Sequence, residues 1–458
     1  MKRHVCVWMV PLLLAAGAGW AAVKAKPRAK PAPKSAEVYA VSMQAVGTFD
    51  ESPPASKVTI SAAPDEYEPA SFVIRWPKAV SSVTVALSGD LVSGKNRLPA
   101  SRAAISAVEG NRLSPVRPFD LTPGEAKRFW ITFQVPEGAR PGIYQGAVVA
   151  TAGGRRIGRL PIELNVLGMR LVKSSKQYGV LLPYAGPGEP LLATLRAVRA
   201  GGFSLVSTGA PPEELSGVLA AIREAGFGYP VPYIFPGLTA EGLDAVREQA
   251  RAVGSSRLLV CAAYEPRTQE QIDDAARLNR AIRAAGLSSF AVIDDPTAYE
   301  QLADSVDYLD DHVDLPYIRG LVSGNKPAPN RREWWYWDVT RSARDNRLYA
   351  GLLLWKSGLY GAFPPLSPGG PAEDGSVIGT IQWEALREGI DDTRYITSMM
   401  RVLREARDLH KAKATGDAAE SFLTAALAKP LRSLTNRDVQ GIRYQIAQYT
   451  VKLQKAAK

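Results

Sequence analysis

The feature that most constrains the fold is a regular alternation of strand-like and helix-like runs that begins at Lys176. Each short β-rich run is followed by a run with apolar residues three or four positions apart, which is typical of a buried strand and an amphipathic helix. Eight such units fill residues 176–410, which is the size of a (β/α)8 barrel. The predicted strands are residues 178–182, 203–207, 231–235, 258–264, 290–293, 306–315, 333–337 and 359–363.

Helix-like runs separate these strands, and the longest of them covers residues 381–405. A doubly wound sheet shows the same alternation, but the chain lacks the glycine-rich phosphate loop that such a sheet carries at its crossover. We therefore expect a TIM-type barrel, with C-terminal helices in residues 411–458. The other predicted helices are residues 189–200, 211–225, 240–252, 269–285, 298–303, 346–355, 418–428 and 436–455.

Residues 37–171 have a different pattern, in which short alternating runs are separated by Gly, Pro and Asp. Pro141 and Gly142 form a turn signal directly before the predicted strand 143–151. Several short strands at this spacing predict a β-sandwich. The segment holds no catalytic constellation, so we expect the sandwich to pack against the barrel.

The N-terminus has the pattern of an export signal in residues 1–22. Lys2 and Arg3 precede an apolar run, residues 5–19, and small residues follow it, so cleavage is expected after Ala21 or Ala22. The apolar run is shorter than the roughly 20 residues that span a bilayer. We therefore predict an exported protein that resides in the periplasm, at the cell surface or outside the cell.

The net charge of +11 is concentrated near the N-terminus. Seven basic residues and no acidic one lie in the first 34 positions, which leaves +4 for the rest of the chain. This distribution excludes nucleic-acid binding as the main role. Residues 23–36 form a Lys/Pro/Ala linker that serves either as a spacer or as a weak contact with an anionic envelope.

The absence of several sequence motifs excludes common kinds of catalytic site. The chain has three histidines, no paired histidines at zinc spacing, no Gly-x-Ser-x-Gly elbow and no phosphate-binding loop. Removal of the signal would leave Cys261 as the one cysteine, so no intramolecular disulfide is expected. We predict no metal and no cofactor. Hydrolysis catalysed by carboxyl groups is the simplest reaction that the remaining residues allow.

Barrel enzymes carry their working groups where strands end, and Glu265 follows the apolar strand 258–264. A carboxyl half buried there favours the protonated form that a general acid needs. Alternatively, Glu265 only stabilises the start of the next helix. A second carboxylate is needed, and Asp338 is favoured over Asp294 and Asp310 because it ends the strand almost opposite. The run Asp294-Asp295-Pro296 also fits a helix cap, since Asp directly before Pro is typical of a helix start, while Asp294 remains a candidate substrate contact.

Aromatic residues cluster in residues 331–361, and rings beside charged groups suit a sugar site, since pyranose C–H faces stack on indoles. Alternation along a strand sends half of these rings to each face, so they could equally fill the core. Besides Asp294, the predicted substrate-binding residues are Trp334, Trp335, Trp337, Arg347, Trp355, Tyr184 and Tyr360.

Several motifs of this chain resemble glycoside hydrolase family 123 and the related domain of unknown function 4091. They are Tyr264-Glu265-Pro266, NRLYAGLLLWKSG at 346–358 and WEALREGIDDTRY at 383–395, while EYEPASF at 66–72 and VPEGARPGIYQG at 135–146 resemble the accompanying sandwich. The resemblance implies an exported sandwich-plus-barrel protein that acts on glycans. In that family an Asp orients the 2-acetamido group of the substrate and the following Glu protonates the leaving oxygen. Carried over, this Glu is Glu265, whereas Tyr264 stands in place of the Asp.

Two functions from different classes follow. The first is a glycoside hydrolase with catalytic residues Glu265, Asp338 and Tyr264, and the second is a glycan-binding or envelope-scaffold protein without catalysis. Arg387 and Asp391, one turn apart in the helix 381–405, are predicted to form structural salt bridges that secure this helix to the barrel.

Overall fold

A parallel sheet follows Lys176 in the computed structural model, with strand order β13-β19-β18-β17-β16-β15-β14. The structure describes residues 42–49, 53–182, 186, 188–253, 257–325, 332–365, 379–407 and 409–457, so the predicted signal and linker lie outside the described residues. The strands of this sheet are β13 (Gln177–Tyr178), β14 (Val231–Tyr233), β15 (Leu258–Tyr264), β16 (Ser288–Ile293), β17 (Tyr308–His312), β18 (Arg332–Tyr336) and β19 (Gly361–Ala362).

The sheet is curled, and both of its faces are buried. Leu259, Phe290 and Trp334 share a cluster inside the curl, whereas Leu258 and Trp335 belong to the larger cluster formed with the surrounding helices. Alternate residues of a strand point to opposite faces, so strands covered on both sides are apolar throughout.

The predicted second strand of the barrel, residues 203–207, is present as an irregular segment. Ser207 N donates to Val180 O beyond β13, and Thr208 N donates to Pro232 O of β14, so this segment bonds both edges of the sheet. The hydroxyl of Ser204 bonds to the backbone of Tyr178, which takes the place of regular strand pairing.

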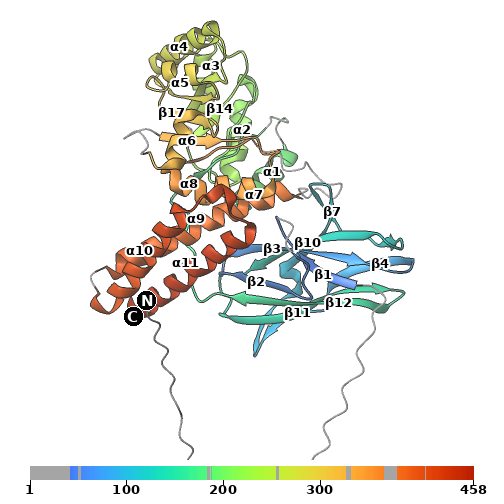
Figure 1. Ribbon diagram of the computed structural model, residues 1–458. Coiled ribbons are helices and arrows are strands. Elements are labelled where there is room, and N and C mark those ends of the chain that lie inside the picture. Colours follow the sequence, from blue (N-terminus) through green and yellow to red (C-terminus); the bar gives the residue numbers. More distant parts are fainter. Residues whose placement is uncertain are drawn as a thin grey trace, which may run out of the picture. The chain divides into compact units, whose positions relative to one another are not determined.

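Helices follow most strands, and α9, α10 and α11 pack together at the end of the chain (Figure 1). The predicted helix 346–355 is divided at Gly351 into α7 and α8, because this residue has non-helical backbone angles of φ −108° and ψ −110°. The helices are α1 (Glu189–Ala200), α2 (Leu215–Glu224), α3 (Leu243–Ala252), α4 (Gln269–Ala284), α5 (Pro296–Leu302), α6 (Pro316–Ser323), α7 (Ala343–Ala350), α8 (Leu352–Ser357), α9 (Ile381–Ala406), α10 (Lys413–Ala428) and α11 (Asn436–Ala457), with 3-10 turns η1 (Ala100–Arg102), η2 (Pro212–Glu214), η3 (His410–Ala412) and η4 (Leu431–Ser433).

The preceding β region forms two sheets whose facing side chains, such as Phe72, Phe129 and Val148, build a separate core. One sheet has the order β1-β3-β10-β7-β8-β20, and its last strand comes from the segment directly before α9. The strands are β1 (Ser42–Val46), β2 (Val58–Ala62), β3 (Glu66–Arg75), β4 (Val80–Leu87), β5 (Leu91–Ser93), β6 (Asn96–Leu98), β7 (Ala103–Glu109), β8 (Arg112–Pro115), β9 (Phe119–Leu121), β10 (Ala126–Val135), β11 (Gly142–Ala152), β12 (Arg155–Val166) and β20 (Gly379–Thr380).

Buried charges join β3 to α9 and α11. The guanidinium of Arg443 lies 3.3 Å from Glu66, 3.1 Å from Glu68 and 2.8 Å from Glu388. It also donates a 2.7 Å hydrogen bond to Asp392. A buried carboxyl group keeps its charge only where partners compensate for lost water. Because carboxyls outnumber guanidinium groups here, burial raises the pKa of Glu66 to about 8 and raises the pKa of Glu388.

Helix α9 is also held to the sandwich through Glu384. Its Oε2 accepts hydrogen bonds from Trp130 Nε1 at 3.2 Å and from Thr132 Oγ1 at 3.1 Å, and Arg387 donates to it at 2.6 Å. Arg387 and Asp391 do form salt bridges, the second with Arg394 at 2.7 Å. Through Glu384, the Arg387 salt bridge therefore supports the contact of α9 with the sandwich, whereas the prediction had attached this helix to the barrel.

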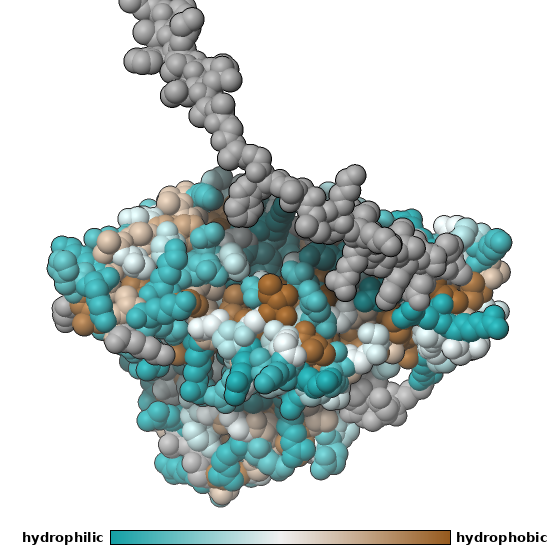
Figure 2. Space-filling view, turned by 90° about the horizontal axis from the view of Figure 1, so that it is seen from below, coloured by the Kyte–Doolittle hydropathy of each residue, from teal (hydrophilic) through white to brown (hydrophobic). Residues whose placement is uncertain are grey.

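Two further findings concern the surface. In the part of the chain that the structure describes, no helix combines the length and the apolar character that a membrane span requires. On the face in Figure 2, hydrophilic side chains predominate, and among the coloured residues hydrophobic side chains form small separate groups.

Candidate active site

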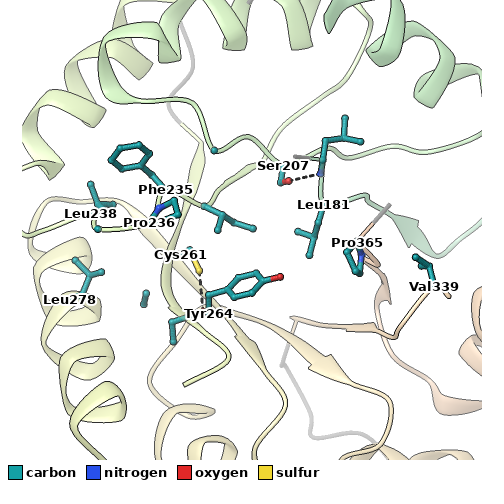
Figure 3. A pocket seen from close by; sticks show the side chains of 16 residues that line it. Leu181, Ser207, Phe235, Pro236, Leu238, Cys261, Tyr264, Leu278, Val339 and Pro365 are labelled. Atoms are coloured by element: carbon teal, nitrogen blue, oxygen red, sulfur yellow. Dashed lines mark hydrogen bonds between the residues drawn. The ribbon is translucent and has the colours of Figure 1, made fainter. Parts of the chain in front are cut away.

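A cavity of about 840 Å³ lies at the carboxyl ends of the strands, and we call it the carboxyl-end cavity. Its lining comes from the residues after β13 and β14, the end of β15 and the residues after β18 and β19, as expected where parallel strands end together (Figure 3). The lining is mostly apolar. It includes Leu181, Leu182, Ser207, Ile234, Phe235, Leu238, Cys261, Tyr264, Val339 and Pro365.

The ring of Tyr264 projects into this cavity and is 50% exposed (Figure 3). Partial burial, followed by the charge of Glu265, raises the pKa of Tyr264 above its ordinary value of 10. Tyr264 therefore presents a neutral hydroxyl at neutral pH.

Glu265, the next residue, has an unusual backbone conformation. Its φ is 48°, in the left-handed region, while its N–H donates a 2.8 Å hydrogen bond to Val292 O of β16. For a residue other than glycine, such a conformation costs about 1–3 kcal/mol, and strain of this kind occurs mostly at functional sites. Glu265 directly follows the last residue of β15, and its side chain is 30% exposed.

Two side chains from other positions contact this carboxyl. Tyr336, at the end of β18, donates a 2.8 Å hydrogen bond to Oε1 of Glu265. Burial, and after it the hydrogen bond to Glu265, raise the pKa of Tyr336, so its hydroxyl stays a proton donor. Arg267 approaches Oε2 of Glu265 to 3.8 Å.

Arg267 also forms a salt bridge and a hydrogen bond with Asp294, which follows β16. Thr268 caps the start of α4, and the backbone N–H of the adjacent Arg267 donates a 2.8 Å hydrogen bond to Gln271 Oε1 in the same cap. The predicted helix cap at the start of α5 is Asp295, whose Oδ1 accepts from Thr297 N at 2.9 Å and from Ala298 N. Since Asp295 caps the helix, Asp294 is available to pair with Arg267. The structure thus brings Glu265 and Asp294 to one guanidinium group.

His312 and Asp310 of β17 complete the surroundings. The ring of His312 meets that of Tyr336 edge-on at 5.1 Å, and burial lowers the pKa of His312, so the imidazole is neutral at neutral pH. Asp310 is fully buried, and no hydrogen-bond partner of its carboxyl oxygens is present among the described residues. Burial, followed by the charge of Asp311, raises the pKa of Asp310 well above its ordinary value.

No contact between Glu265 and Asp338, the predicted second carboxylate, is present among the described residues. The Asp338 side chain is exposed, and its Oδ1 accepts a 2.8 Å hydrogen bond from Thr340 N within the turn after β18. This turn bond, and the hydroxyl of Thr340, lower the pKa of Asp338.

The predicted aromatic residues lie away from the cavity surface. Trp334 is inside the curled sheet, stacked on Tyr308 at 5.0 Å, while Trp335 and Trp337 pack with Tyr349 among the helices. The three tryptophans are each 0% exposed. None of them offers a free ring face to a sugar.

The other predicted substrate residues are also distributed elsewhere. Arg347 is 0% exposed and donates two 2.9 Å hydrogen bonds to Asp392 of α9. Trp355 is partly buried near Lys176, and Tyr360 precedes β19, at the amino ends of the strands. Tyr184 lies outside the described residues.

Arg267, Tyr336 and His312 were not among the predicted site residues. The signal for Tyr336 is alternation along β18, which sends Trp334 and Tyr336 inward and Trp335 outward. Arg267 follows Glu265 by two positions, but its contact with Asp294 joins segments that are far apart in the chain and meet only in the folded protein.

No group of three or more metal-ligating side chains is found among the residues that the structure describes. Among the described residues, the arrangement around Glu265 offers three carboxyl groups, one guanidinium, two neutral phenols and a neutral imidazole. These groups can donate and accept protons next to an apolar cavity.

Comparison with known proteins shows a shared fold. No family model matches the chain, and no curated protein sequence matches it. The chain is similar to the solved structure of a family 123 glycoside hydrolase from Clostridium perfringens, with a TM-score of 0.64 and 11% identity over 91% of this chain and 98% of that chain. It also matches a family 39 glycoside hydrolase from Bacteroides cellulosilyticus WH2, with a TM-score of 0.36 and 10% identity over 73% and 81% of the two chains, a similarity too weak to indicate a shared fold.

Proposed function

We propose that this protein is an exported glycoside hydrolase in which Glu265 is the general acid. The observation that carries this proposal is the arrangement of Glu265 in a strained turn at a strand end, bonded to Tyr336 and close to Asp294 through Arg267. The fold shared with a family 123 glycoside hydrolase supports the reaction class. We further infer that residues 203–208 supply the eighth position of a (β/α)8 barrel, since they bond both β13 and β14.

In the proposed reaction, protonated Glu265 gives its proton to the glycosidic oxygen while the bond between this oxygen and the anomeric carbon breaks. A second carboxylate is needed for the positive anomeric centre or for the attacking water. Asp294 fills this role better than Asp338, because Asp294 shares the Arg267 guanidinium with Glu265. Water then supplies the new oxygen at the anomeric carbon, and its proton restores the acid.

The side chain before Glu265 restricts the substrate. A neutral phenol at Tyr264 lacks the negative charge with which a carboxylate orients an acetamide N–H. We therefore propose that the substrate is a sugar without a 2-acetamido group.

Localisation completes the proposal. The basic start, the apolar residues 5–19 and the small residues that follow support export. The Lys/Pro/Ala linker, residues 23–36, would then separate the folded part from the envelope or contact an anionic envelope surface weakly.

A panel of aryl glycosides with and without the 2-acetamido group tests the proposal. We expect wild type to hydrolyse a member without this group, and Glu265→Gln to reduce kcat by about 10²–10⁴-fold. The matched control is Glu270→Gln, an exposed position in the first turn of α4, which should behave as wild type. Equal kcat in wild type and Glu265→Gln would contradict the assignment.

A carbohydrate-binding protein without catalysis is the second candidate. The half-exposed ring of Tyr264 favours this second function. Tyr264 lines the cavity and stands at the position where glycoside hydrolase family 123, which this chain resembles, has a catalytic Asp. Retention of a glycan by both wild type and Glu265→Gln, with no cleavage of the panel, would support this function over hydrolysis.

A further inference from the structure

A second cavity, of about 700 Å³, lies at the amino ends of the strands, and we call it the amino-end pocket. Its walls are the start of β3, the segment that leads into β13, the end of α1, Tyr360 and one side of α9. Because the sheet is parallel, this pocket and the carboxyl-end cavity lie at opposite ends of the strands.

The lining of this pocket carries more positive than negative charge. Arg394 engages both acidic lining residues, Asp391 at 2.7 Å and Asp65 at 3.2 Å. Among the described residues, the other basic lining residues form no salt bridge with these two carboxylates. They are Lys173, Lys176, Arg199 and Arg387.

Arg387 is bonded on one side only. Its Nη2 donates to Glu384 at 2.6 Å, and its guanidinium lies 5.1 Å from the ring centre of Tyr67. The side chain is buried, with 9% of the residue exposed, yet Nε has no hydrogen-bond partner among the described residues. A buried donor without a partner is costly, and a ligand in the pocket would satisfy it.

Lys176 also has hydrogen-bond donors that are not used. Its Nζ donates one hydrogen bond, of 2.6 Å, to Leu359 O, although an ammonium group has three donors. Burial lowers the pKa of Lys176 to about 8, which reflects a charge that has lost water without gaining an anion. Lys173 lies on the same segment and is exposed.

Tyr360 adds an aromatic surface beside these cations. Its ring is 41% exposed and belongs to the pocket lining. Tyr360 is one of the residues predicted from the sequence for a sugar site, but the active-site arrangement at the other end of the strands does not use it. A flat exposed ring next to cationic side chains suits a molecule with an apolar face and an anionic group.

We propose that the amino-end pocket binds a small molecule that carries a carboxylate or phosphate group, through Lys173, Lys176 and Arg387, with the Tyr360 ring against its apolar face. Sugar acids and phosphorylated sugars share this chemistry. The site is separate from Glu265 and does not depend on hydrolysis.

Isothermal titration calorimetry of the folded protein with three probes tests the proposal. The probes are glucuronate, inorganic phosphate and, as the neutral counterpart, glucose. We expect glucuronate, phosphate or both to bind and glucose not to bind. Binding of glucuronate alone would identify a sugar acid as the ligand class, and binding of phosphate alone would identify a phosphorylated ligand.

Variants locate the binding. Lys173→Ala and Tyr360→Ala change exposed side chains and should each weaken binding severalfold, while Lys176→Met should weaken it about tenfold, as for a lost hydrogen bond to a charged group. The control Arg401→Ala removes an exposed charge from the same helix as Arg387, outside the pocket, and should bind as wild type. The variant Glu265→Gln should also bind as wild type.

Three results would overturn the proposal. The first is the absence of heat from both anions up to about 10 mM, ten times the dissociation constant of a weak millimolar ligand. The second is equal binding of glucose and glucuronate. The third is unchanged affinity in all three pocket variants, which would place the anion elsewhere on the protein.

Discussion

The hydroxyl of Tyr336 donates a 2.8 Å hydrogen bond to Oε1 of Glu265, and this bond joins the ends of β18 and β15, which are not neighbours in the sheet. A side chain from across the curl therefore fixes the orientation of the carboxyl. The strained turn at Glu265 and this bond together hold one carboxyl oxygen in place and leave the other facing Arg267.

Removal of this hydroxyl tests how far Glu265 depends on it. Tyr336→Phe should reduce kcat for a cleaved aryl glycoside about 10–100-fold with little change in KM, because a misplaced acid affects the transition state more than substrate binding. Thermal unfolding should confirm that the variant folds. Tyr360→Phe removes a hydroxyl at the opposite end of the strands and should retain wild-type kcat.

Two aspartates distinguish the structural site from the predicted one. Asp294→Asn should reduce kcat at least 100-fold, because Asp294 shares Arg267 with Glu265, whereas Asp338→Asn should change it less than threefold. Steady-state kinetics on the same glycoside measures both. A large loss of kcat in Asp338→Asn, together with near wild-type kcat in Asp294→Asn, would instead support Asp338 as the second carboxylate, as predicted from the sequence.

The buried tryptophans should affect stability only. Trp335→Ala leaves a cavity next to Trp337 and Tyr349 and should lower the free energy of unfolding by about 3–5 kcal/mol, with unchanged ligand affinity in the folded protein. Denaturant unfolding and calorimetry provide the two measurements. Weaker ligand binding without loss of stability would mean that the ring contacts the ligand.

The carboxyl of Glu66 should make stability depend on pH. Its pKa is raised from 4.5 to about 8, by burial first and by Asp391 second, so the folded state holds a proton that the unfolded chain releases. The free energy of unfolding should therefore fall as pH rises from about 4.5 to about 8. Glu66→Gln should make this fall shallower in chemical denaturation at several pH values. The exposed Glu137→Gln serves as control, and an identical slope in both variants would contradict the assignment.

Export is tested by N-terminal sequencing. We expect the mature chain in the envelope or medium fraction to begin near Ala22, since small residues follow the apolar run there. An intact Met1 in the cytoplasmic fraction would show that the segment is not a cleaved signal.

Local patterns along the chain predicted several of the helices and strands. The helix expected at residues 189–200 is α1 (Glu189–Ala200), and the long helix expected at 381–405 is α9 (Ile381–Ala406). Asp before Pro296 predicted a helix start, and Asp295 is its cap. These features depend on neighbours within a few residues, so the sequence contains them directly.

Local patterns did not predict the irregular backbone of residues 203–208 or the division of the helix at Gly351. Ser204 has a strand-like neighbourhood, but its hydroxyl meets the backbone of Tyr178 only once the sheet has curled. In the same way, α6 (Pro316–Ser323) was not predicted, because eight residues are too few for a clear helical period.

By itself, the sequence determined the alternation of strands and helices after Lys176, the place of Glu265 at a strand end and the neutral phenol beside it, since these follow from residues close together in the chain. Tertiary structure alone decided that Asp294 shares Arg267 with Glu265, that Tyr336 reaches it from across the curl, and that Arg347 serves the contact of α7 with α9. The physical reason is that alternation along a strand predicts to which face of the sheet a side chain points. Which side chains of other strands and helices it contacts depends on the curl of the sheet and on where α4 begins.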